Sequence, residues 1–548
     1  MPKRTRSSRA IPSAGLEPPA STQQPGRRHV TASEPRDEHG EYLPLHGTKL
    51  VLLTIAVSIA SFMEILDMTI VNVSIPSIAG SLAVSPSEGT WAISSYMLAA
   101  AVVQPLTGWI GRQYGEVRTF VTSSLLFVLF SALCGLATSM PMLIAGRLTQ
   151  GLVSGPMMSV GQALLLRNYP VKLRGLALGL WAMVVIVAPI FGPIMGGWIT
   201  DNLSWPWLFY INVPVGILAA VIIGIVLRRR ESTKMKTPID AVGLALLVIG
   251  VGSLQFMLDN GNEKDWFSSI EIITAAIVAV VAIGFMIPWE LTDKHPVVDL
   301  HLFQRRNFLV GTSTIAVAYF AFMGVNVVYP LWLQTTLGYT STWAGLAMAP
   351  VGILALVLAP IIGRNLHRMN LRLAAATAFL IFGVNVWWVA GLNETATFSQ
   401  LALPRLFQGI GMPLFFLPLN QIVMAGVGPA ELASAAGLSN FIRTISGSIS
   451  TAVSVYLWNT RTDYHHAVLT EHIRPDSGAW LAFQRTLAGH GIDGAAAAAY
   501  TDRLVQQQAM TLAVSDVFYL LAVMFLVLIP FVWFARPPFG APGSGAAH

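Results

Sequence analysis

Long runs of apolar residues, separated by short basic or Gly- and Pro-containing breaks, extend along most of the chain. Each run is close to the twenty or so residues that an α-helix needs to cross a bilayer. The pattern predicts fourteen transmembrane helices with approximate limits 50–73, 91–110, 118–138, 141–166, 176–200, 207–227, 240–259, 269–290, 308–333, 343–363, 372–392, 400–424, 433–458 and 512–534.

The composition agrees with this pattern. The 548 residues are 54% hydrophobic and only 11% charged, whereas a soluble domain averages about 25% charged residues. We therefore expect an all-α polytopic membrane protein. The net charge of +6 comes from basic residues beside the spans, so it does not indicate nucleic-acid binding. The single cysteine, Cys134, excludes an intrachain disulfide.

Basic residues alternate between loops. Lys or Arg follows spans two, four, six, eight and ten, as in Arg228-Arg229-Arg230, and is absent after spans one, three, five, nine and eleven. The positive-inside rule then places the even-numbered loops and both termini in the cytoplasm. Residues 1–46 are polar and lack the apolar core of a signal peptide, so we predict a disordered cytoplasmic tail.

Short motifs recur at matching places in the two parts of the chain. Thr90-Trp91-Ala92 matches Thr342-Trp343-Ala344, PLTGWIGR (105–112) matches PIIGR (360–364), and RLTQG (147–151) matches RLFQG (405–409). The offsets of 252, 255 and 258 residues indicate duplicated halves. Such halves are typical of secondary transporters, whose substrate site lies near the midplane between them.

The repeat predicts the domain organisation. Residues 48–230 form an N-terminal six-helix half, residues 231–300 two inserted helices, and residues 301–540 a C-terminal six-helix half. The last of these includes a long polar, helix-prone external loop at 460–511.

Two acids and one arginine lie inside apolar spans. Glu64 and Asp67 are three residues apart in span one, on roughly the same helix face, and Arg147 lies in span four. A charge at the bilayer centre costs at least about 2.5–3.5 kcal/mol, so these side chains must face protein or a water-filled cavity. A carboxyl whose surroundings change between two states can bind and release a proton. The alternatives are a neutral structural acid and an arginine that serves helix packing.

Several stretches resemble motifs of the fourteen-helix drug:proton antiporter family of the major facilitator superfamily. They are LDMTIVNVSIP (66–76), GWIGRQYGEVR (108–118), RLTQGLVSGP (147–156), APIFGPIMGG (188–197) and WPWLFYINVPVG (205–216). Four others resemble the inner-membrane exporters of tripartite efflux pumps: IDAVGLALLVIGVGSLQFMLDNG (239–261), TWAGLAMAPVGI (342–353), SNFIRTISGSI (439–449) and WFARPPFG (533–540). The resemblance covers residues 48 to 540.

The resemblance implies roles for single residues. It assigns proton coupling to Asp67 and Arg147, and we add Glu64, which lies beside Asp67. The antiporter motif comprises Pro189, Gly192, Pro193, Gly196 and Gly197, and the loop motif Gly108, Arg112, Gly115 and Arg118. The superfamily usually has an acid where this chain has Arg112, so the gating salt bridge attributed to that acid does not carry over.

Other side chains are candidates for the substrate cavity: Met63, Asn72, Trp181, Met183, Phe191 and Arg443. A soft apolar pocket could be formed by Met63, Trp181, Met183 and Phe191, although packing against lipid or the protein core is the simpler explanation for each of them. Arg443 suits acidic substrates or a structural role. His465, His466 and His472 have no standard ligand spacing, so we expect no metal site and no cofactor.

We therefore expect a proton-coupled antiporter, not an enzyme, that exports amphipathic drugs or toxic hydrophobic compounds across the bacterial inner membrane. Export of an endogenous metabolite or lipid is the alternative. A membrane enzyme would need a catalytic constellation, and a self-contained ATP-driven pump would need a phosphate-binding loop; the sequence contains neither. The resemblance implies a periplasmic membrane-fusion adaptor and an outer-membrane channel as partners. Loop 460–511 is the expected docking site, or else a cap over the exit path.

Overall fold

The computed structural model describes residues 43–170, 173, 184, 188, 191–232, 234, 238–261, 264–293, 296–427, 432–473, 477–537 and 539. These ranges contain helices and no strand, as expected for a bilayer, where a helix satisfies its own backbone hydrogen bonds. The prediction of an all-α membrane protein is confirmed. Residues 1–42 of the predicted tail lie outside the described part.

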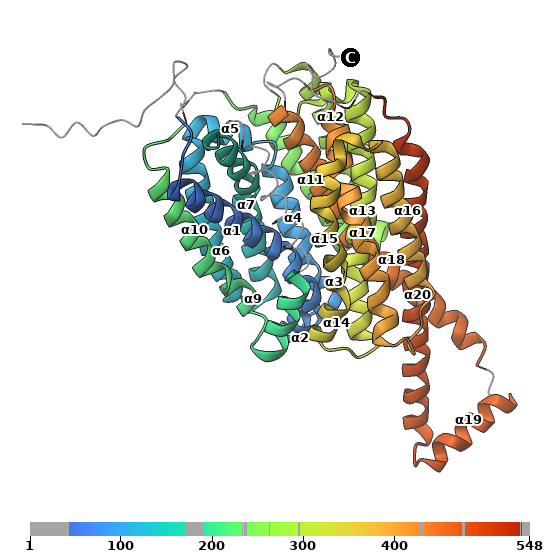
Figure 1. Ribbon diagram of the computed structural model, residues 1–548. Helices are drawn as coiled ribbons and strands as arrows, with labels where there is room; N and C mark the ends of the chain where they lie inside the picture. The colour runs from blue at the N-terminus through green and yellow to red at the C-terminus, as the bar shows by residue number, and fades with distance from the viewer. Residues whose placement is uncertain are drawn as a thin grey trace, which may run out of the picture. The chain divides into compact units, whose positions relative to one another are not determined.

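The N-terminal half (Figure 1) contains α1 (Thr48–Ile70), η1 (Asn72–Ser74), α2 (Ile75–Ser81), α3 (Pro86–Gly89), α4 (Trp91–Val103), α5 (Thr107–Tyr114), α6 (Glu116–Gly135), α7 (Met140–Asn168), α9 (Trp207–Tyr210) and α10 (Asn212–Val226). The inserted segment contains α11 (Ala241–Asn260), η3 (Trp266–Ser268), α12 (Ile270–Thr292) and η4 (Leu300–Gln304). The C-terminal half contains α13 (Arg306–Thr335), α14 (Ser341–Met348), α15 (Val351–Asn365), η5 (Leu366–Arg368), α16 (Leu371–Ala390), α17 (Phe398–Met424), α18 (Leu432–Glu471), α19 (Gly478–Gly489) and α20 (Gly494–Val532).

The described residues contain 10 helices that are long and apolar enough to cross a membrane, or 11 if a bent pair counts as one span. The bent pair joins α3–α4 to α5 at an angle of 59°, and Pro105 lies in the break. Two further helices, α7 and α18, contain the predicted fourth and thirteenth spans but are more polar. Only 191–202 of the fifth span is described as continuous helix. The count of fourteen therefore stays a prediction.

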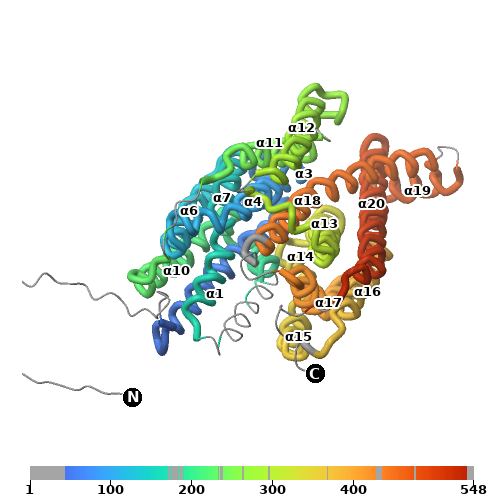
Figure 2. Tube along the Cα trace, turned by 90° about the horizontal axis from the view of Figure 1, so that it is seen from above, coloured from blue at the N-terminus to red at the C-terminus, as the bar shows by residue number. Residues whose placement is uncertain are grey.

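The two halves pack their helices in the same way. In the N-terminal half, α7 packs against α4 and α6, while α10 packs against α1 and α6. In the C-terminal half, α17 packs against α15 and α16, while α20 packs against α13 and α16. Figure 2 shows the two groups side by side in the view from above. The sequence repeat thus corresponds to a repeated arrangement of helices.

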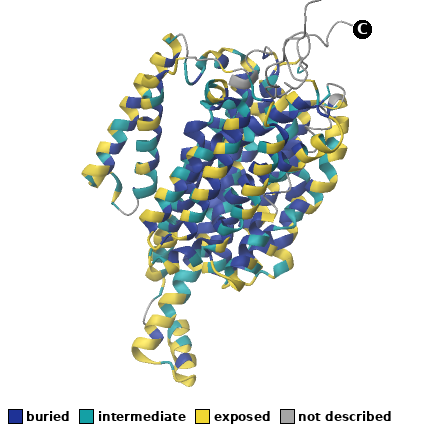
Figure 3. Ribbon diagram, turned by 90° about the vertical axis from the view of Figure 1, so that its left-hand side faces the viewer, coloured by how far each residue is buried: buried dark blue, intermediate teal, exposed yellow. Residues whose placement is uncertain are grey.

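The inserted helices α11 and α12 pack mainly on each other and stand at the edge of the bundle (Figure 3). Their outer faces carry exposed apolar side chains such as Ile270, Val280 and Phe285, which suits contact with lipid. The pair is fixed to both halves near the end of α11. Ser94 of α4 donates a hydrogen bond to Asp259 (2.9 Å), and Ser448 of α18 donates one to Gln255 (3.1 Å).

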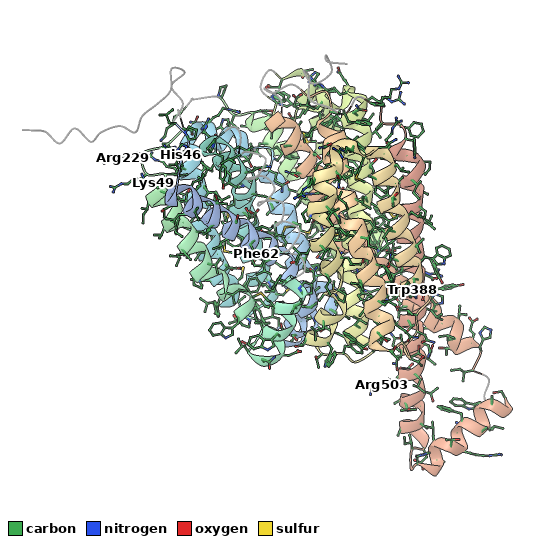
Figure 4. All side chains as sticks on the ribbon, in the orientation of Figure 1. His46, Lys49, Phe62, Arg229, Trp388 and Arg503 are labelled. Atoms are coloured by element: carbon green, nitrogen blue, oxygen red, sulfur yellow. The ribbon has the colours of Figure 1, made fainter. Side chains whose placement is uncertain are left out.

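The predicted external loop at 460–511 consists largely of helix. Helix α18 continues to Glu471, α19 follows, and α20 begins at Gly494, so the segment projects from one end of the bundle (Figure 1). We call residues 460–511 the helical extension. Arg503 lies on it in Figure 4, whereas Lys49 and Arg229 lie near the opposite end of the bundle.

Candidate functional site

The centre of the N-terminal half holds a buried ion pair. Arg147 of α7 donates a hydrogen bond from Nη1 to Oδ2 of Asp67 on α1, at 2.5 Å, and both side chains are 0% exposed. Two helices that are 80 residues apart in sequence therefore meet through opposite charges. Breaking such a pair by removing one partner costs about 3–5 kcal/mol, because a buried charge is left uncompensated.

Two amides complete the coordination of the Asp67 carboxylate. Its Oδ1 accepts hydrogen bonds from Asn212 Nδ2 (2.7 Å) and from Gln150 Nε2 (3.2 Å). Gln150 follows Arg147 by three residues, so both point from the same face of α7. Asn212 is the first residue of α10, and it also donates to Ser131 Oγ at 3.0 Å. Helices α7 and α10 thus converge on one carboxylate of α1, and α6 is joined to it through Asn212.

The guanidinium of Arg147 is fixed from a further helix. Its Nε donates to the carbonyl of Ala92 in α4 at 2.8 Å, and the Tyr96 ring lies beneath it, with 4.2 Å between Cζ and the ring centroid. A cation over an aromatic face is stabilised electrostatically. The remaining nitrogen, Nη2, is buried without a hydrogen-bond partner among the described residues. Arg147 therefore holds a spare donor beside Asp67.

Glu64 lies one turn before Asp67 and is also buried. Its Oε2 has no hydrogen-bond partner among the described residues. The structure thus brings the predicted pair Asp67 and Arg147 into contact and leaves one carboxyl oxygen of Glu64, on the same helix as Asp67, without a hydrogen-bond partner among the described residues.

The candidates for the substrate cavity are dispersed. Met63 is buried where α1 faces Gly216 of α10, within the N-terminal half. Asn72 is buried in η1, and Phe191 is 44% exposed and packs edge-on against Phe62, which is labelled in Figure 4. Trp181 and Met183 lie outside the described residues.

Arg443 does line a cavity, in the C-terminal half. The wall includes Ile315 of α13, Phe415 and Phe416 of α17, and Asn440 of α18. The Arg443 guanidinium lies 5.6 Å from the centroid of Tyr319. We call this space the Arg443 cavity. It combines aromatic surface, amides and one cation, which are the groups that bind an amphipathic molecule with an acidic end.

The antiporter-motif glycines lie at close helix contacts. A Cβ on Gly192 would meet Thr69, and one on Gly196 would meet the end of α1 at Ile70. On the other side of this helix, a Cβ on Gly197 would overlap the backbone of Ser341, and Pro193 touches Gly345 of α14. Residues 191–202 are therefore wedged between the two halves. Pro189 lies outside the described residues.

The loop motif forms the turn between α5 and α6. Gly115 has φ +96°, a conformation that favours glycine. Glu231, just after the basic stretch that follows α10, accepts hydrogen bonds from the backbone of Val117 and Arg118 at 2.9 and 3.1 Å. A carboxylate at a helix start satisfies free N–H groups and the helix dipole. Gly108 and Arg112 lie in α5, and Arg112 is exposed.

Sequence reasoning missed the groups that surround the ion pair: Gln150, Asn212, Ser131 and Tyr96. A signal existed for the first two, because both are polar residues inside quoted motifs, RLTQG and WPWLFYINVPVG. The three loop histidines bind single protein groups instead of a common ion. His465 contacts Asp516 at 2.7 Å and His466 contacts Asp502 at 3.1 Å, and the described residues contain no cluster suited to a metal.

Comparison with known proteins decides the family. The model of the Major Facilitator Superfamily matches residues 57–451. The chain belongs to the major facilitator superfamily. This superfamily member is 48% identical to "Multidrug export protein EmrB" of Escherichia coli K12, over 92% of this chain and 99% of that protein. It is 42% identical to "Fatty acid resistance protein FarB" of Neisseria gonorrhoeae, over 92% of this chain and 100% of that one.

The fold is also found among solved structures. The crystal structure of an auto-inhibited POT family peptide transporter superposes with a TM-score of 0.61 at 15% identity, covering 91% of this chain and 99% of that chain. The 48% identity to EmrB confirms the resemblance to drug exporters that the sequence motifs indicated. This superfamily member is a multi-pass membrane transporter, and the prediction that it is not an enzyme is confirmed by its family.

Proposed function

We propose that this chain is a proton-coupled multidrug exporter of the inner membrane, which moves amphipathic drugs or toxic hydrophobic compounds outward by alternating access. The names of its relatives, a multidrug exporter and a fatty acid resistance protein, support export as the activity. The observation that carries the proton-coupled part is the fully buried Asp67–Arg147 pair between α1 and α7.

The pair offers a simple exchange. A carboxylate in a region without water must be neutralised, either by a cation or by a proton. With Asp67 ionised, Arg147 neutralises it. With Asp67 protonated, Arg147 is released, and its spare Nη2 and the unpaired Oε2 of Glu64 supply the next donor and acceptor. The proton and the arginine thus compete for one carboxylate.

Such an exchange requires relative movement of helices. Arg147 is tethered to α4 through the Ala92 carbonyl, whereas Asp67 belongs to α1 and is tethered to α10 through Asn212. Separation of Arg147 from Asp67 therefore changes the packing of α4 relative to α1. Because α4 also contacts α18 of the other half, for example through Ser448 to the Ser94 carbonyl (2.8 Å), this change reaches the interface between halves.

The groups around the Arg443 cavity support the substrate class. The cavity has about 10 Å³ open to the centre of a water-sized sphere in this structure, so it must widen in another state of the cycle before a drug can enter. Its phenylalanines and Tyr319 provide apolar surface, and Arg443 provides a cation that can receive a carboxylate or another acidic group. A multidrug range suits such a wall, since aromatic contact needs no exact hydrogen-bond match. The same observation favours a second candidate, export of an acidic endogenous metabolite or lipid.

The partners we propose are an EmrA-like periplasmic membrane-fusion adaptor and a TolC-like outer-membrane channel. The helical extension supports this, because it presents a folded surface beyond the bundle instead of a slack loop. With both termini cytoplasmic, the extension lies on the periplasmic side. The proton gradient is the only energy source required, with no cofactor.

Substrate-dependent proton movement in proteoliposomes tests the proposal. Purified protein with an internal pH dye should release or take up protons when a lipophilic drug is added across a pH gradient. Asp67→Asn keeps the size of the side chain and removes the charge. The variant should fold with lower stability, because Arg147 then lacks its charged partner, and it should lose the response. Full, gradient-dependent export by this variant would remove Asp67 from coupling, and drug export indifferent to the gradient in the parent protein would overturn antiport altogether.

A further inference from the structure

The C-terminal half contains a copy of the arginine site. Arg405 in α17 follows Arg147 by 258 residues and is 3% exposed. Its Nη1 donates to Gln408 Oε1 at 2.9 Å, as Arg147 does to Gln150 at 2.8 Å. Its guanidinium lies 4.3 Å from the centroid of Tyr329, as that of Arg147 lies 4.2 Å from Tyr96. The arginine–glutamine pair with an aromatic neighbour thus recurs, although the ring comes from α4 in the N-terminal half and from α13 in the C-terminal half.

The copy lacks its carboxylate. Val325 of α13 lines a cavity together with Arg405, and α13 has the place in this half that α1, which carries Asp67, has in the other. The six predicted spans of this half contain one acid, Asp516. That acid contacts Arg461 and His465, at 2.6 and 2.7 Å. No carboxylate in these spans is therefore available to Arg405.

Unused donors surround the cavity. Arg405 Nε and Nη2, and Gln408 Nε2, are buried with no hydrogen-bond partner among the described residues. Asn385 and Phe518 also line this cavity. The volume open to the centre of a water-sized sphere is about 10 Å³. That is roughly the space for one water molecule or one monatomic ion, and too little for phosphate or a drug.

A buried guanidinium needs a negative partner. Arginine does not lose its proton in proteins, so it cannot become neutral in place. The Tyr329 ring offsets part of the cost of removing the guanidinium from water, but a single cation–π contact does not replace a charged partner for a buried ion. Water would satisfy the donors without balancing the charge. A small anion does both.

We propose that this cavity binds a single monatomic anion, with chloride as the species, coordinated by Arg405 and Gln408. The anion occupies the place that the carboxylate of Asp67 has in the other half. All of its wall residues belong to α13, α16, α17 and α20, so the site is internal to the C-terminal half. It does not depend on proton coupling, and it would hold even if the proposed function were wrong.

Thermal unfolding of the purified full-length protein tests this. Sodium chloride and sodium gluconate are compared at equal ionic strength, since gluconate is too large for the cavity. Because a ligand of the folded state stabilises it, the unfolding midpoint should rise saturably as chloride replaces gluconate. In Arg405→Gln the apparent chloride affinity should fall roughly tenfold or more, because the charge-assisted contact is lost.

Two variants make the test decisive. Val325→Asp supplies an internal carboxylate, as in the N-terminal half, and should make the midpoint independent of chloride while the protein remains folded. Arg443→Gln removes an arginine that α18 carries within this half and should leave the chloride response intact. Bromide, soaked into crystals, should give an anomalous peak beside Arg405. Each of four results would overturn the site. They are an unfolding midpoint that is equal in chloride and gluconate, a chloride response that persists in Val325→Asp, a chloride response that is lost in Arg443→Gln, and the absence of a bromide peak beside Arg405.

Discussion

Asp201 of the N-terminal half caps the first turn of α14 in the C-terminal half. Its Oδ2 accepts a hydrogen bond from the backbone N–H of Thr342 at 2.7 Å. Nearby, Gln334 of α13 donates to the carbonyl of Val73 at 2.8 Å. These contacts lie at the end of the bundle from which the helical extension projects, so they join the halves on the side predicted to be periplasmic.

The contact of Asp201 with Thr342 holds the two halves closed on this side, so Asp201→Ala should weaken the closed arrangement. Loss of a side-chain cap costs about 1 kcal/mol, which shifts an open–closed ratio by roughly fivefold. The measurement is the rate at which an impermeant maleimide labels a cysteine placed at Ser341, which is 4% exposed, in a Cys134→Ala background. Asp201→Asn keeps one oxygen acceptor and should show the smaller effect. Equal labelling rates in all three proteins would mean that the cap does not bear on closure.

Gly197→Ala should prevent the same closure by steric overlap. The new Cβ would meet the Ser341 carbonyl, with Thr342 Cα at 2.7 Å, and backbone atoms cannot move aside as a flexible side chain can. Export should fall sharply, and the Ser341 cysteine should label fast. Gly80→Ala is the matched control, because nothing lies within 4 Å of a Cβ there. Similar export by the two variants would contradict the wedge role of residues 191–202.

Replacement of Arg147 by lysine should keep part of the proton-coupled export, and replacement by alanine should abolish it. Alanine leaves the Asp67 carboxylate buried and unpaired, with an expected loss of about 3–5 kcal/mol of stability. Lysine keeps the charge but cannot reach Asp67, Gln150 and the Ala92 carbonyl together. Proton flux should be absent in Arg147→Ala and reduced in Arg147→Lys. Normal coupled export in Arg147→Ala would make this arginine a packing residue.

Glu64→Gln tests whether Glu64 takes part in the exchange of partners. Its Oε2 is buried without a hydrogen-bond partner among the described residues, so exchanging the carboxyl for an amide of the same shape should cost the folded protein little stability. If Arg147 moves to Glu64 when Asp67 is protonated, the variant should export more slowly, with drug binding unchanged. Binding of a fluorescent drug and proton flux, measured on one preparation, separate these effects. Unaltered flux would leave Glu64 with a structural role.

The helical extension can be removed without disturbing its base. His466 of α18 and Asp502 of α20 are level with each other, 3.1 Å apart, so residues 467–501 can be replaced by a short Gly/Ser linker. We expect adaptor co-purification and drug resistance in cells to fall while transport in proteoliposomes persists. Transport lost in liposomes would instead assign the segment to a cap over the exit path, and undiminished adaptor binding would place docking elsewhere.

Much of this architecture could be predicted from sequence because each span is an apolar run of fixed length and the halves repeat. The Asp67–Arg147 contact was also foreseeable in kind, since two charges in the membrane must find partners. The details were not. Helix α20 begins at Gly494, well before the predicted span at 512, because the polar stretch around Gln506 continues the helix beyond the apolar run. A hydropathy pattern locates the apolar run that crosses the bilayer, but it does not locate the residue at which the helix begins or ends.

The partners of buried groups depend on helix rotation, which periodicity leaves open. Asn212 was part of a quoted motif, yet only packing of α10 against α1 places its amide on Asp67. Met63 shows the opposite case. Its apolar type suited a substrate wall, but the helix turns it toward Gly216, where it packs inside the half.

Helix α20 is continuous from the helical extension into the bundle, so it can transmit a movement of the C-terminal half to the extension. Its 39 residues span about 58 Å, at about 1.5 Å per residue. The same rigid rod packs on α13, α16 and α18 inside the bundle and carries one arm of the extension outside it. A tilt of about 10° at one end would swing the other by about 10 Å, as simple geometry on that length gives. Rocking of the half within the membrane would therefore be amplified into a stroke at the tip, large enough for anything seated there to be moved in step with each transport cycle.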